Sequence, residues 1–283
     1  MELNEQYIEQ HILSALKEDV GGGDYSSSAC IAPTEKGKAK LVAKQACVVC
    51  GTDIARKVFE LTDKEIVFTP LMKDGRRAEK GDVLFRVEGS AASILTAERT
   101  ALNYMQRLSG IATATAEYVS LIEGTTTRLL DTRKTTPCMR LLEKYAVKTG
   151  GGTNHRMGLY DMIMLKDNHI DFAGGIEKAI DKTLQYLKDK GLDLKIEIEV
   201  RNLDELQRVL AHGGVDRIML DNFSIEDTRK AVELIAHRYE TESSGGITFE
   251  NILSYARCGV DYISVGALTH HIKSIDLSLL ADE

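Results

Sequence analysis

The sequence predicts an α/β protein whose C-terminal part forms an α/β barrel, either complete or open. From about residue 126, strand-like apolar runs alternate with helical stretches, a pattern typical of βαβ crossovers and a parallel sheet. Six such runs fall within residues 127–267, which favours a barrel over a doubly wound sheet. Polar and charged residues follow nearly every run, at the strand ends where barrel enzymes place their active sites.

The elements of this C-terminal part follow from the periodicity of the apolar residues. Glycines at Gly213–Gly214 and Gly259 are placed to end helices before the next strand. In the segment DTRKTTP, Thr135 and Thr136 are expected to cap the following helix, with Pro137 in its first turn. The expected strands are 127–132, 160–168, 194–200, 216–222, 246–249 and 261–267, and the expected helices are 138–150, 175–191, 203–214, 225–239 and 249–259.

Residues 1–109 have a different texture and are predicted to form a separate N-terminal domain, with 110–283 as the barrel domain. The expected helices are 4–18, 52–61 and a long one that begins near Ala91, and the short alternating runs are 39–51, 64–71 and 82–90. Residues 72–89 resemble the small β-sandwich of biotinyl and lipoyl carriers, which would make Lys73 an attachment site. A plain strand–turn–strand module explains the same segment without any modification, and we favour it.

Composition restricts the class of function. The chain has 283 residues, 43% hydrophobic and 28% charged, and a formal net charge of −7. This balance argues against a nucleic-acid groove and against binding to an anionic membrane. No apolar run approaches the roughly 18 residues of a membrane span, and the N-terminal segment has the pattern of an acidic amphipathic helix rather than a signal peptide. We expect a cytoplasmic protein.

Five cysteines, an odd number, favour reduced thiols. Cys47 and Cys50 have the spacing of half a zinc site, but the sequence offers no second pair to complete it. The segment is therefore interpreted as part of an apolar strand.

The polar residues at the strand ends are the candidates for chemistry. A buried strand has no structural need for ionised groups at its end, because their desolvation is costly unless they are paired. One such strand end could be a structural ion pair, but five together favour a functional site. They are Asp131, Arg133 and Lys134; Lys166, Asp167 and Asn168; Glu197 and Glu199; Asp221 and Asn222; and Ser264 and Gly266.

Positive charge gathers in residues 131–169, where seven Lys and Arg face four Asp and Glu in an otherwise acidic chain. Lys144 and Lys148 are expected on the solvated face of a helix. Strand ends or neighbouring glycines place the other candidates where a small anion could reach them, and Arg suits carboxylates and phosphates bidentately. The ligand is therefore expected to carry several negative charges, held by Arg133, Lys134, Arg156 and Lys166.

The acids Glu199 and Asp221 end neighbouring strands among these cations. They suit Mg²⁺ bridging to a polyphosphate or the acceptance of ribose hydroxyls, and a salt bridge to Lys134 or Lys166 is a compatible alternative. The small-residue turns at 242–246 and 264–267 have the character of phosphate-binding turns of late barrel strands.

The sequence lacks the residues that covalent catalysis or a metal-dependent hydrolase would require. The chain has no G-x-S-x-G nucleophile, Cys138 lies at a helix start, and His155 and His169 are not at ligand spacing on one element. From the residues alone we expect a barrel enzyme that acts on a phosphorylated sugar and a polycarboxylate.

The motifs that carry these residues resemble the quinolinate phosphoribosyltransferase family over nearly the whole chain. They are ERTALNYMQRLSGIATAT, DTRKTTPCMRLLEKYAVKTGGGTNHRMGLYDMIMLKDNH, EIEV, IMLDNFS, ESSGGI, GVDYISVGALTH and, near the N-terminus, EDVGGGDYSS. The resemblance implies an N-terminal α/β sandwich domain, a C-terminal open α/β barrel, and a homodimer, or a higher oligomer, in which the partner's N-terminal domain helps to close each active site.

The implied reaction joins quinolinate to phosphoribosyl pyrophosphate with Mg²⁺ and yields nicotinate mononucleotide, pyrophosphate and CO2. The family pattern assigns quinolinate binding to five residues of this sequence and the sugar pyrophosphate to Lys134, and Thr132 is a further substrate-binding residue. It assigns Mg²⁺ and ribose to Glu199 and Asp221. Lys134, Lys166, Glu199 and Asp221 are the expected catalytic residues. The quinolinate residues are Arg99, Arg133, His155, Arg156 and Lys166, and the phosphate residues are Ser244, Gly245, Gly246, Val265, Gly266 and Ala267.

Two rival interpretations share these motifs. One is a related family encoded at molybdenum loci, with the same fold and a different acceptor. The other is a catalytically silent sensor of a nucleotide or sugar phosphate. The complete set of cations for a dicarboxylate disfavours the first, and the presence of Lys134, Glu199 and Asp221 disfavours the second. His270 stands where family members often have serine, a difference with no evident bearing on the chemistry.

Overall fold

The computed structural model describes residues 5–282 and has a mixed α/β fold. It contains two compact units. The N-terminal unit comprises the chain up to Ala116, Pro137–Gly151, and the segment from His271 onward. The barrel unit comprises Glu117–Thr136 and Gly152–His270. Among residues 5–282, none of the helices combines the length and the apolar character needed to span a membrane.

The N-terminal unit is built on a four-stranded antiparallel sheet in the order β12-β1-β5-β3. Burial alternates along β1, so one face of the sheet is in the core, and Phe59 of α3 contacts Phe68 and Phe85 of the sheet there. The strands are β1 (Lys36–Ala43), β2 (Cys47–Val48), β3 (Val67–Pro70), β4 (Arg77–Ala78), β5 (Val83–Ser90) and β12 (Leu277–Ala281), and the helices are α1 (Glu5–Val20), α2 (Tyr25–Cys30), α3 (Thr52–Thr62), α4 (Ala91–Leu121) and α5 (Arg140–Thr149).

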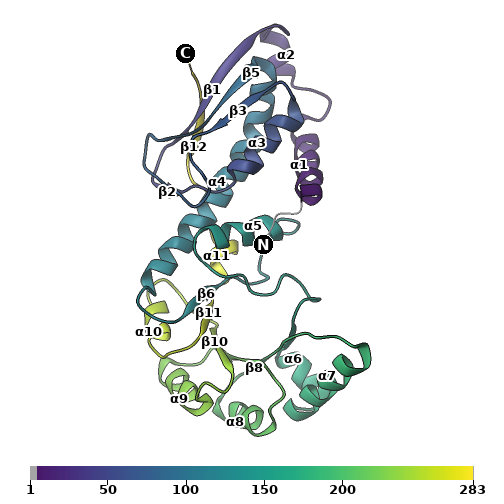
Figure 1. Ribbon diagram of the computed structural model, residues 1–283, viewed down its shortest axis with the longest axis vertical. Coiled ribbons are helices and arrows are strands. Elements are labelled where there is room, and N and C mark those ends of the chain that lie inside the picture. Colours follow the sequence, from purple (N-terminus) through teal and green to yellow (C-terminus); the bar gives the residue numbers. More distant parts are fainter. Residues whose placement is uncertain (1–4, 283) are drawn as a thin grey trace. The chain divides into compact units, whose positions relative to one another are not determined.

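The units are not two consecutive halves of the chain. The last strand, β12, pairs antiparallel with β1, which brings the C-terminal segment into the N-terminal unit. The predicted boundary after Ser109 lies within α4, which runs unbroken from Ala91 to Leu121 (Figure 1). The division into domains 1–109 and 110–283 stays a prediction.

The barrel unit holds a six-stranded sheet in the order β6-β11-β10-β9-β8-β7, with every neighbouring pair parallel. Because β6 and β7 are the two edges, the described strands form an open barrel rather than a closed one. Helices flank the sheet along its outer side (Figure 1). The strands are β6 (Arg128–Leu130), β7 (Ile163–Leu165), β8 (Ile196–Val200), β9 (Arg217–Asp221), β10 (Glu240–Ser244) and β11 (Tyr262–Ser264), and the helices are α6 (Asp167–Ala173), α7 (Ile176–Lys190), α8 (Leu203–His212), α9 (Ile225–Ile235), α10 (Ile252–Ala256) and α11 (Ala267–His270).

The strand register places charged residues together on one face of this sheet. Residues paired between neighbouring strands point to the same face, and so do residues two apart on one strand. Glu197 pairs with Arg217, and Arg217 pairs with Glu240. Glu242, two residues beyond Glu240, pairs with Tyr262 of β11. This shared face is therefore polar, whereas Ile196, Ile198 and Val200 of β8 supply buried apolar contacts on the other face.

Several local expectations were wrong. The strand expected at 246–249 is Glu240–Ser244 instead, because the helix expected over 225–239 ends at Ile235, followed by positive φ at Ala236 and His237. Glycines at 245 and 246 then turn the chain, both with positive φ. The apolar Ile247 and Phe249 had suggested a strand that the turn does not allow.

The helix after DTRKTTP also differs from expectation. It begins at Arg140 with Met139 as its N-cap, so Thr135, Thr136 and Pro137 precede it. Lys148 is exposed as expected, but Lys144 is fully buried, because most sides of α5 are covered within the N-terminal unit. Cys47 and Cys50 are buried, only Cys47 lies in a strand, and all five cysteines are free thiols.

Candidate functional site

Most of the predicted site residues lie at the carboxyl ends of the barrel strands or directly after them, on one edge of the parallel sheet. Arg99 is an exception and is exposed on α4 in the N-terminal unit. His155 and Arg156 lie between α5 and β7, just after Thr153, which bridges to Leu130 of β6. The structure therefore assembles Thr132 through Lys134, His155, Arg156, Lys166, Glu199, Asp221, Ser244–Gly246 and Val265–Ala267 in one unit.

Asp131, the first residue after β6, fastens the loop that carries His155 and Arg156. Its carboxylate is fully buried and accepts hydrogen bonds from the His155 main-chain N–H at 2.9 Å and from Asn154 Nδ2 at 2.6 Å. The Asp131 N–H donates to the Thr153 carbonyl, so the loop runs alongside β6. Asp131 thus orients the loop that carries His155 and Arg156.

Two arginines occupy this part of the site. Burial, and then the positive charge of Arg133, lower the pKa of Arg156. The Arg156 guanidinium donates to the Met162 carbonyl at 3.2 Å and contacts Met164 Sδ at 3.6 Å, so it is held from β7 and the residue before it. The two positively charged guanidinium groups repel each other. A ligand with several negative charges would reduce this repulsion, so the pair suits such a ligand.

Lys134 lies against the turn that follows β11. A Cβ placed on Gly266 would lie 3.0 Å from Lys134 Cδ, so this position suits a glycine. Thr269 Oγ1 donates to the Lys134 carbonyl at 2.9 Å, and the Lys134 N–H donates to Thr132 Oγ1 at 3.0 Å. The lysine of DTRKTTP and the predicted phosphate-binding turn are therefore neighbours.

Glu199 and Asp221, the acidic residues of the predicted site, each have a partner within the chain. Glu199 is buried and forms an ion pair with the more exposed Lys166 at 3.1 Å, as the alternative interpretation from the sequence proposed. Asp221 accepts a hydrogen bond from Asn222 Nδ2 at 2.8 Å. Asn222 has a φ of 54°, and a side chain on Gly245 would collide with it, so the turns after β9 and β10 fit closely together.

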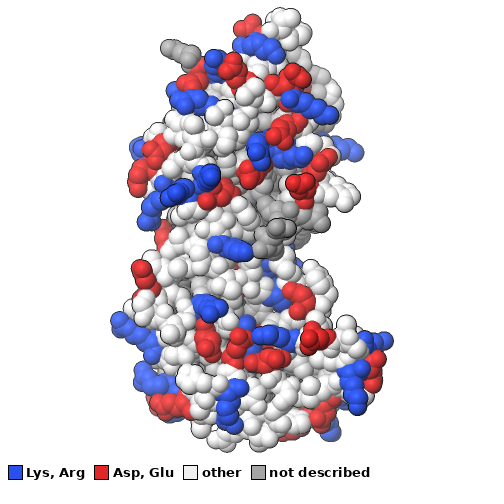
Figure 2. Space-filling view, in the orientation of Figure 1, with Lys and Arg blue, Asp and Glu red and all other residues white. Residues whose placement is uncertain are grey.

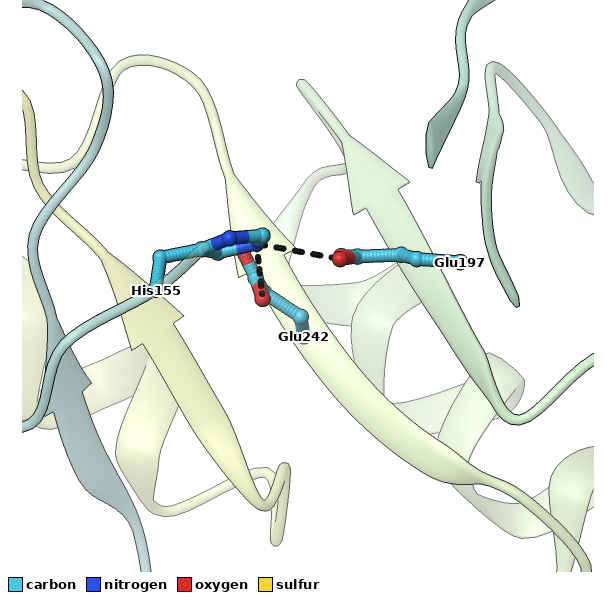
Figure 3. A group of neighbouring side chains, drawn as sticks. All are labelled: His155, Glu197 and Glu242. Carbon is cyan, nitrogen blue, oxygen red and sulfur yellow. Dashed lines mark ion pairs between the residues drawn. The ribbon is translucent and has the colours of Figure 1, made fainter. Parts of the chain in front are cut away.

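A buried cluster lies below these groups, formed by His155, Glu197 of β8 and Glu242 of β10. His155 Nε2 lies 3.0 Å from Glu197 Oε2 and 3.4 Å from Glu242 Oε2. Figure 3 shows both carboxylates pointing at the imidazole from their strands. Both glutamates are fully buried. Arg217 of β9 donates to Glu242 at 3.1 Å and to Glu240 at 3.0 Å, and its guanidinium stacks over the Tyr262 ring at 4.1 Å.

This arrangement shifts the pKa of each member. Burial and the negative charge of Glu242 raise the pKa of Glu197 to about 7. For Glu242, burial acts in the opposite direction, but the contacts with His155, Ser264 and Arg217 outweigh it and lower the pKa. For His155, burial lowers the pKa, yet both carboxylates together raise it to about 9.

The proton on the His155 ring is located by a further contact. The Arg156 main-chain N–H donates to His155 Nδ1 at 2.7 Å, which requires an Nδ1 without a proton. A doubly protonated imidazole could not accept this hydrogen bond at Nδ1, although the neighbouring carboxylates favour the doubly protonated form. We therefore assign the neutral form with the proton on Nε2, and place the extra proton of the cluster on Glu197. These hydrogen positions follow from the heavy-atom geometry.

A metal ion is a second possible use of the same three side chains. Within residues 5–282 they are the only set of at least three His, Cys, Asp or Glu ligand atoms close enough to share an ion. However, the Arg217 guanidinium already donates to the same Glu242 oxygen that lies nearest His155. A divalent cation there would stand beside a buried positive charge, so a hydrogen-bonded cluster is the better description.

Sequence reasoning had missed this cluster. Glu242 was assigned to a turn, and Glu197 was only one of several charged residues at strand ends. The signal that could have found it is the alternation of Glu197 with Ile196 and Ile198, which puts a carboxylate on the inner face of a strand.

The loops after β8 and β9, with the starts of the helices that follow them, line an open hollow of about 320 Å³. Its lining residues are Arg201, Asn202, Leu203, Asp204, Asn222, Phe223, Ser224 and Asp227.

On the face shown in Figure 2, basic and acidic residues are intermixed. Positive charge is therefore a local property of the site rather than of this surface.

Comparisons with known proteins agree with the motifs. The family model described as quinolinate phosphoribosyl transferase, C-terminal domain, matches residues 111–280, and that of the N-terminal domain matches 24–109. The chain is 43% identical over 262 residues to a probable nicotinate-nucleotide pyrophosphorylase (carboxylating) of Bacillus subtilis, covering 93% of this chain and 89% of the relative. It is 42% identical to the chloroplastic enzyme of that name from Arabidopsis thaliana, covering 95% and 81%.

A solved structure gives the same result for the fold. The nicotinate-nucleotide pyrophosphorylase from Francisella tularensis has a TM-score of 0.94 and 42% identity, and covers 99% of this chain and 98% of its own. The N-terminal match includes Lys73, so the segment once compared with biotinyl carriers is part of this family's own N-terminal domain.

Proposed function

The chain belongs to the quinolinate phosphoribosyltransferase family, and we propose that it transfers the phosphoribosyl group of phosphoribosyl pyrophosphate to quinolinate with loss of CO2. The products are nicotinate mononucleotide and pyrophosphate, and the reaction is that of a pentosyltransferase in the de novo synthesis of NAD. The observation that carries the proposal is the pair formed by Arg133, which follows β6, and Arg156, whose guanidinium is held by the Met162 carbonyl and whose pKa is lowered by burial and by the charge of Arg133.

Quinolinate carries two carboxylates, which match this pair. Arg forks bind carboxylates bidentately, and Lys166, already held by Glu199, supplies a further cation at the edge of the site. Arg99 completes the proposed quinolinate set, and the family pattern adds His155, whose role is taken up below.

The sugar pyrophosphate is assigned to the opposite side of the site. The Lys134 side chain lies beside Gly266 of the turn at Val265–Ala267, and the Lys134 N–H donates to Thr132 Oγ1. The turn at Ser244–Gly246, with two glycines of positive φ, is the second phosphate-binding element.

Glu199 and Asp221 are the proposed Mg²⁺ and ribose residues. Oxygen donors of this kind fit Mg²⁺, which is usually held by one or two carboxylates together with substrate phosphates. When bound, the ion would neutralise negative charge on the pyrophosphate. Lys166 balances Glu199 in its absence.

The residues of the chain then act on charge that develops in the reaction. As the bond to pyrophosphate weakens, the ribose becomes positive, and the carboxylates of Glu199 and Asp221 stabilise it. Lys134 stabilises the departing pyrophosphate, and the pyridine nitrogen forms the new bond. The carboxylate beside that nitrogen is then lost as CO2, because the pyridinium stabilises the electron pair left on the adjacent ring carbon, and this carbon takes up a proton from solvent.

We also propose that the protein works as a homodimer or a higher oligomer in the cytoplasm. Leu159, Tyr160 and Phe172, in and after the loop that carries Arg156, are 74%, 75% and 89% exposed, which suits a protein partner. Arg99 of one protomer would then help to close the site of the other. Light scattering coupled to size exclusion tests the assembly, and a monomer would contradict it.

The test of the function is an assay with quinolinate, phosphoribosyl pyrophosphate and Mg²⁺. We expect nicotinate mononucleotide and CO2 in equal amounts, with no product when Mg²⁺ is chelated. Turnover of nicotinic acid but not of quinolinate would contradict the proposal and favour an enzyme for a different acceptor. Binding of phosphoribosyl pyrophosphate without turnover of either acid would favour the sensor interpretation.

A further inference from the structure

We propose that His155 is a positioning residue, held by Glu197 and Glu242, that acts on quinolinate through Arg156 rather than by direct contact. The proposal rests on the assignment of Arg156 to quinolinate above. It differs from the family-based expectation that His155 itself binds the substrate.

Both ring nitrogens of His155 are engaged within the chain. Nδ1 accepts the hydrogen bond of the Arg156 main-chain N–H at 2.7 Å, and Nε2 faces the two glutamate carboxylates at 3.0 and 3.4 Å. The side chain is only 5% exposed. A substrate carboxylate would have to displace one of these partners to reach a nitrogen.

The partners of His155 tie its loop to the wall of the barrel. Glu197 and Glu242 belong to β8 and β10, and Arg217 of β9 between them binds Glu242. His155 enters from the segment between α5 and β7, and Figure 3 shows its imidazole facing Glu197 and Glu242. The imidazole is therefore the link between three strands and a loop.

On the opposite side, the same loop is fixed to β6. The Asp131 carboxylate accepts the main-chain N–H of His155, and Arg156 follows directly in the chain. The Arg156 backbone is thus held by His155 Nδ1, while the guanidinium is held by Met162 and Met164. These contacts fix where Arg156 presents its charge.

The composition of the cluster favours a role beyond packing. Barrel interiors are typically filled with branched apolar side chains, which need no partners. Here two fully buried acidic side chains lie beside Arg217, which pairs with Glu242, and beside His155, which contacts both of them. Such a set fixes orientation more strictly than apolar packing, because hydrogen bonds are directional.

A double-mutant cycle between His155 and Arg156 tests the proposal. In His155→Gln the side-chain amide still donates to the carboxylates, so the cluster stays partnered, but the acceptor for Arg156 is lost. We expect the dissociation constant for quinolinate, measured by calorimetry without turnover, to rise about five- to tenfold. In the Arg156→Ala background the same change should have no further effect.

Equal effects of His155→Gln in both backgrounds would overturn the proposal, because they would show that His155 acts on quinolinate independently of Arg156. Glu242→Gln should weaken quinolinate binding in the same direction and leave the KM for phosphoribosyl pyrophosphate within twofold. His212→Gln, on the outer helix α8, is the matched control and should change neither constant. Thermal melting of each variant checks that it is folded.

A second measurement does not depend on the substrate. The ¹⁵N shifts of His155, assigned by their loss in His155→Gln, should report a proton on Nε2 and none on Nδ1. A protonated Nδ1 would overturn the proposal. If the wild-type protein binds no quinolinate while the ring has the expected form, the proposed function fails and the positioning geometry stands.

Discussion

The two units of this chain fill their interiors in opposite ways. In the N-terminal unit, Phe59, Phe68 and Phe85 pack against one another between a helix and the sheet. In the barrel unit, Glu197, Glu242, Arg217 and His155 occupy the inner face of the strands. Apolar burial in the first interior stabilises the fold. In the second interior, pairing of the buried charges must first offset their desolvation before the interior stabilises the fold. The difference indicates that the barrel interior serves the site above it.

The apolar interior is broken most simply by Phe85→Ala. The side chain is 1% exposed, and its loss leaves a cavity against Phe59 and Phe68. We expect the free energy of unfolding to fall by about 3–5 kcal/mol, measured by urea denaturation. Leu280→Ala, at a 41% exposed residue, is the control and should cost much less. A small loss for Phe85→Ala would contradict the assignment of this core.

The charged interior is broken by Arg217→Met. This change leaves the Glu242 carboxylate buried without its cation and should destabilise the protein by about 3–5 kcal/mol. If Glu242→Leu is added, the second substitution should restore much of the loss, because it removes a carboxylate left without its partner. Quinolinate binding should stay weak in the double variant. Full recovery of both properties would show that the cluster has no role beyond packing.

The site itself is tested by Arg133→Ala. Loss of one charge-assisted contact should weaken quinolinate binding by about 1.5–3 kcal/mol, with a much smaller effect on phosphoribosyl pyrophosphate. Calorimetry with each ligand separates the two constants. Lys148→Ala, on the exposed side of α5, serves as the control. Equal losses for both ligands would contradict the division of roles between Arg133 and Lys134.

The buried proton of the cluster predicts a pH dependence. The pKa of Glu197 is raised from 4.5 to about 7 in the folded protein, so this group stabilises the fold below pH 4.5 and loses that contribution as the pH rises through 7. The contribution is on the order of 2 kcal/mol. Urea unfolding at pH 5 and pH 8 should show a smaller difference for Glu197→Gln than for wild type. Glu233→Gln, at an exposed residue, should behave like wild type.

The sequence predicted the features that repeat along the chain. Alternating strands and helices predicted an α/β barrel, complete or open, and charged residues at strand ends predicted the candidate site, because both follow from local periodicity. The family resemblance gave the membership that the comparisons confirmed. The Glu199–Lys166 ion pair was also anticipated as an alternative.

Features that depend on contacts between residues far apart in the sequence could not be predicted in this way. The pairing of β12 with β1 joins residues far apart in sequence, and no local pattern specifies it. Strand β10 was misplaced because its sequence, ETESS, is polar on both faces, and its stability comes from Arg217, His155 and neighbouring strands. Lys144 appeared exposed because a helical lysine usually is, and only the tertiary structure buries it.

The central claim is that paired guanidiniums at the end of the barrel recognise two carboxylates. The most direct measurement compares the affinity of the wild-type protein for quinolinate with that for nicotinate, which lacks one carboxylate, by calorimetry under the same conditions. The account predicts that nicotinate binds at least about tenfold more weakly, since it loses one charge-assisted contact. Equal affinities for the two acids would contradict it.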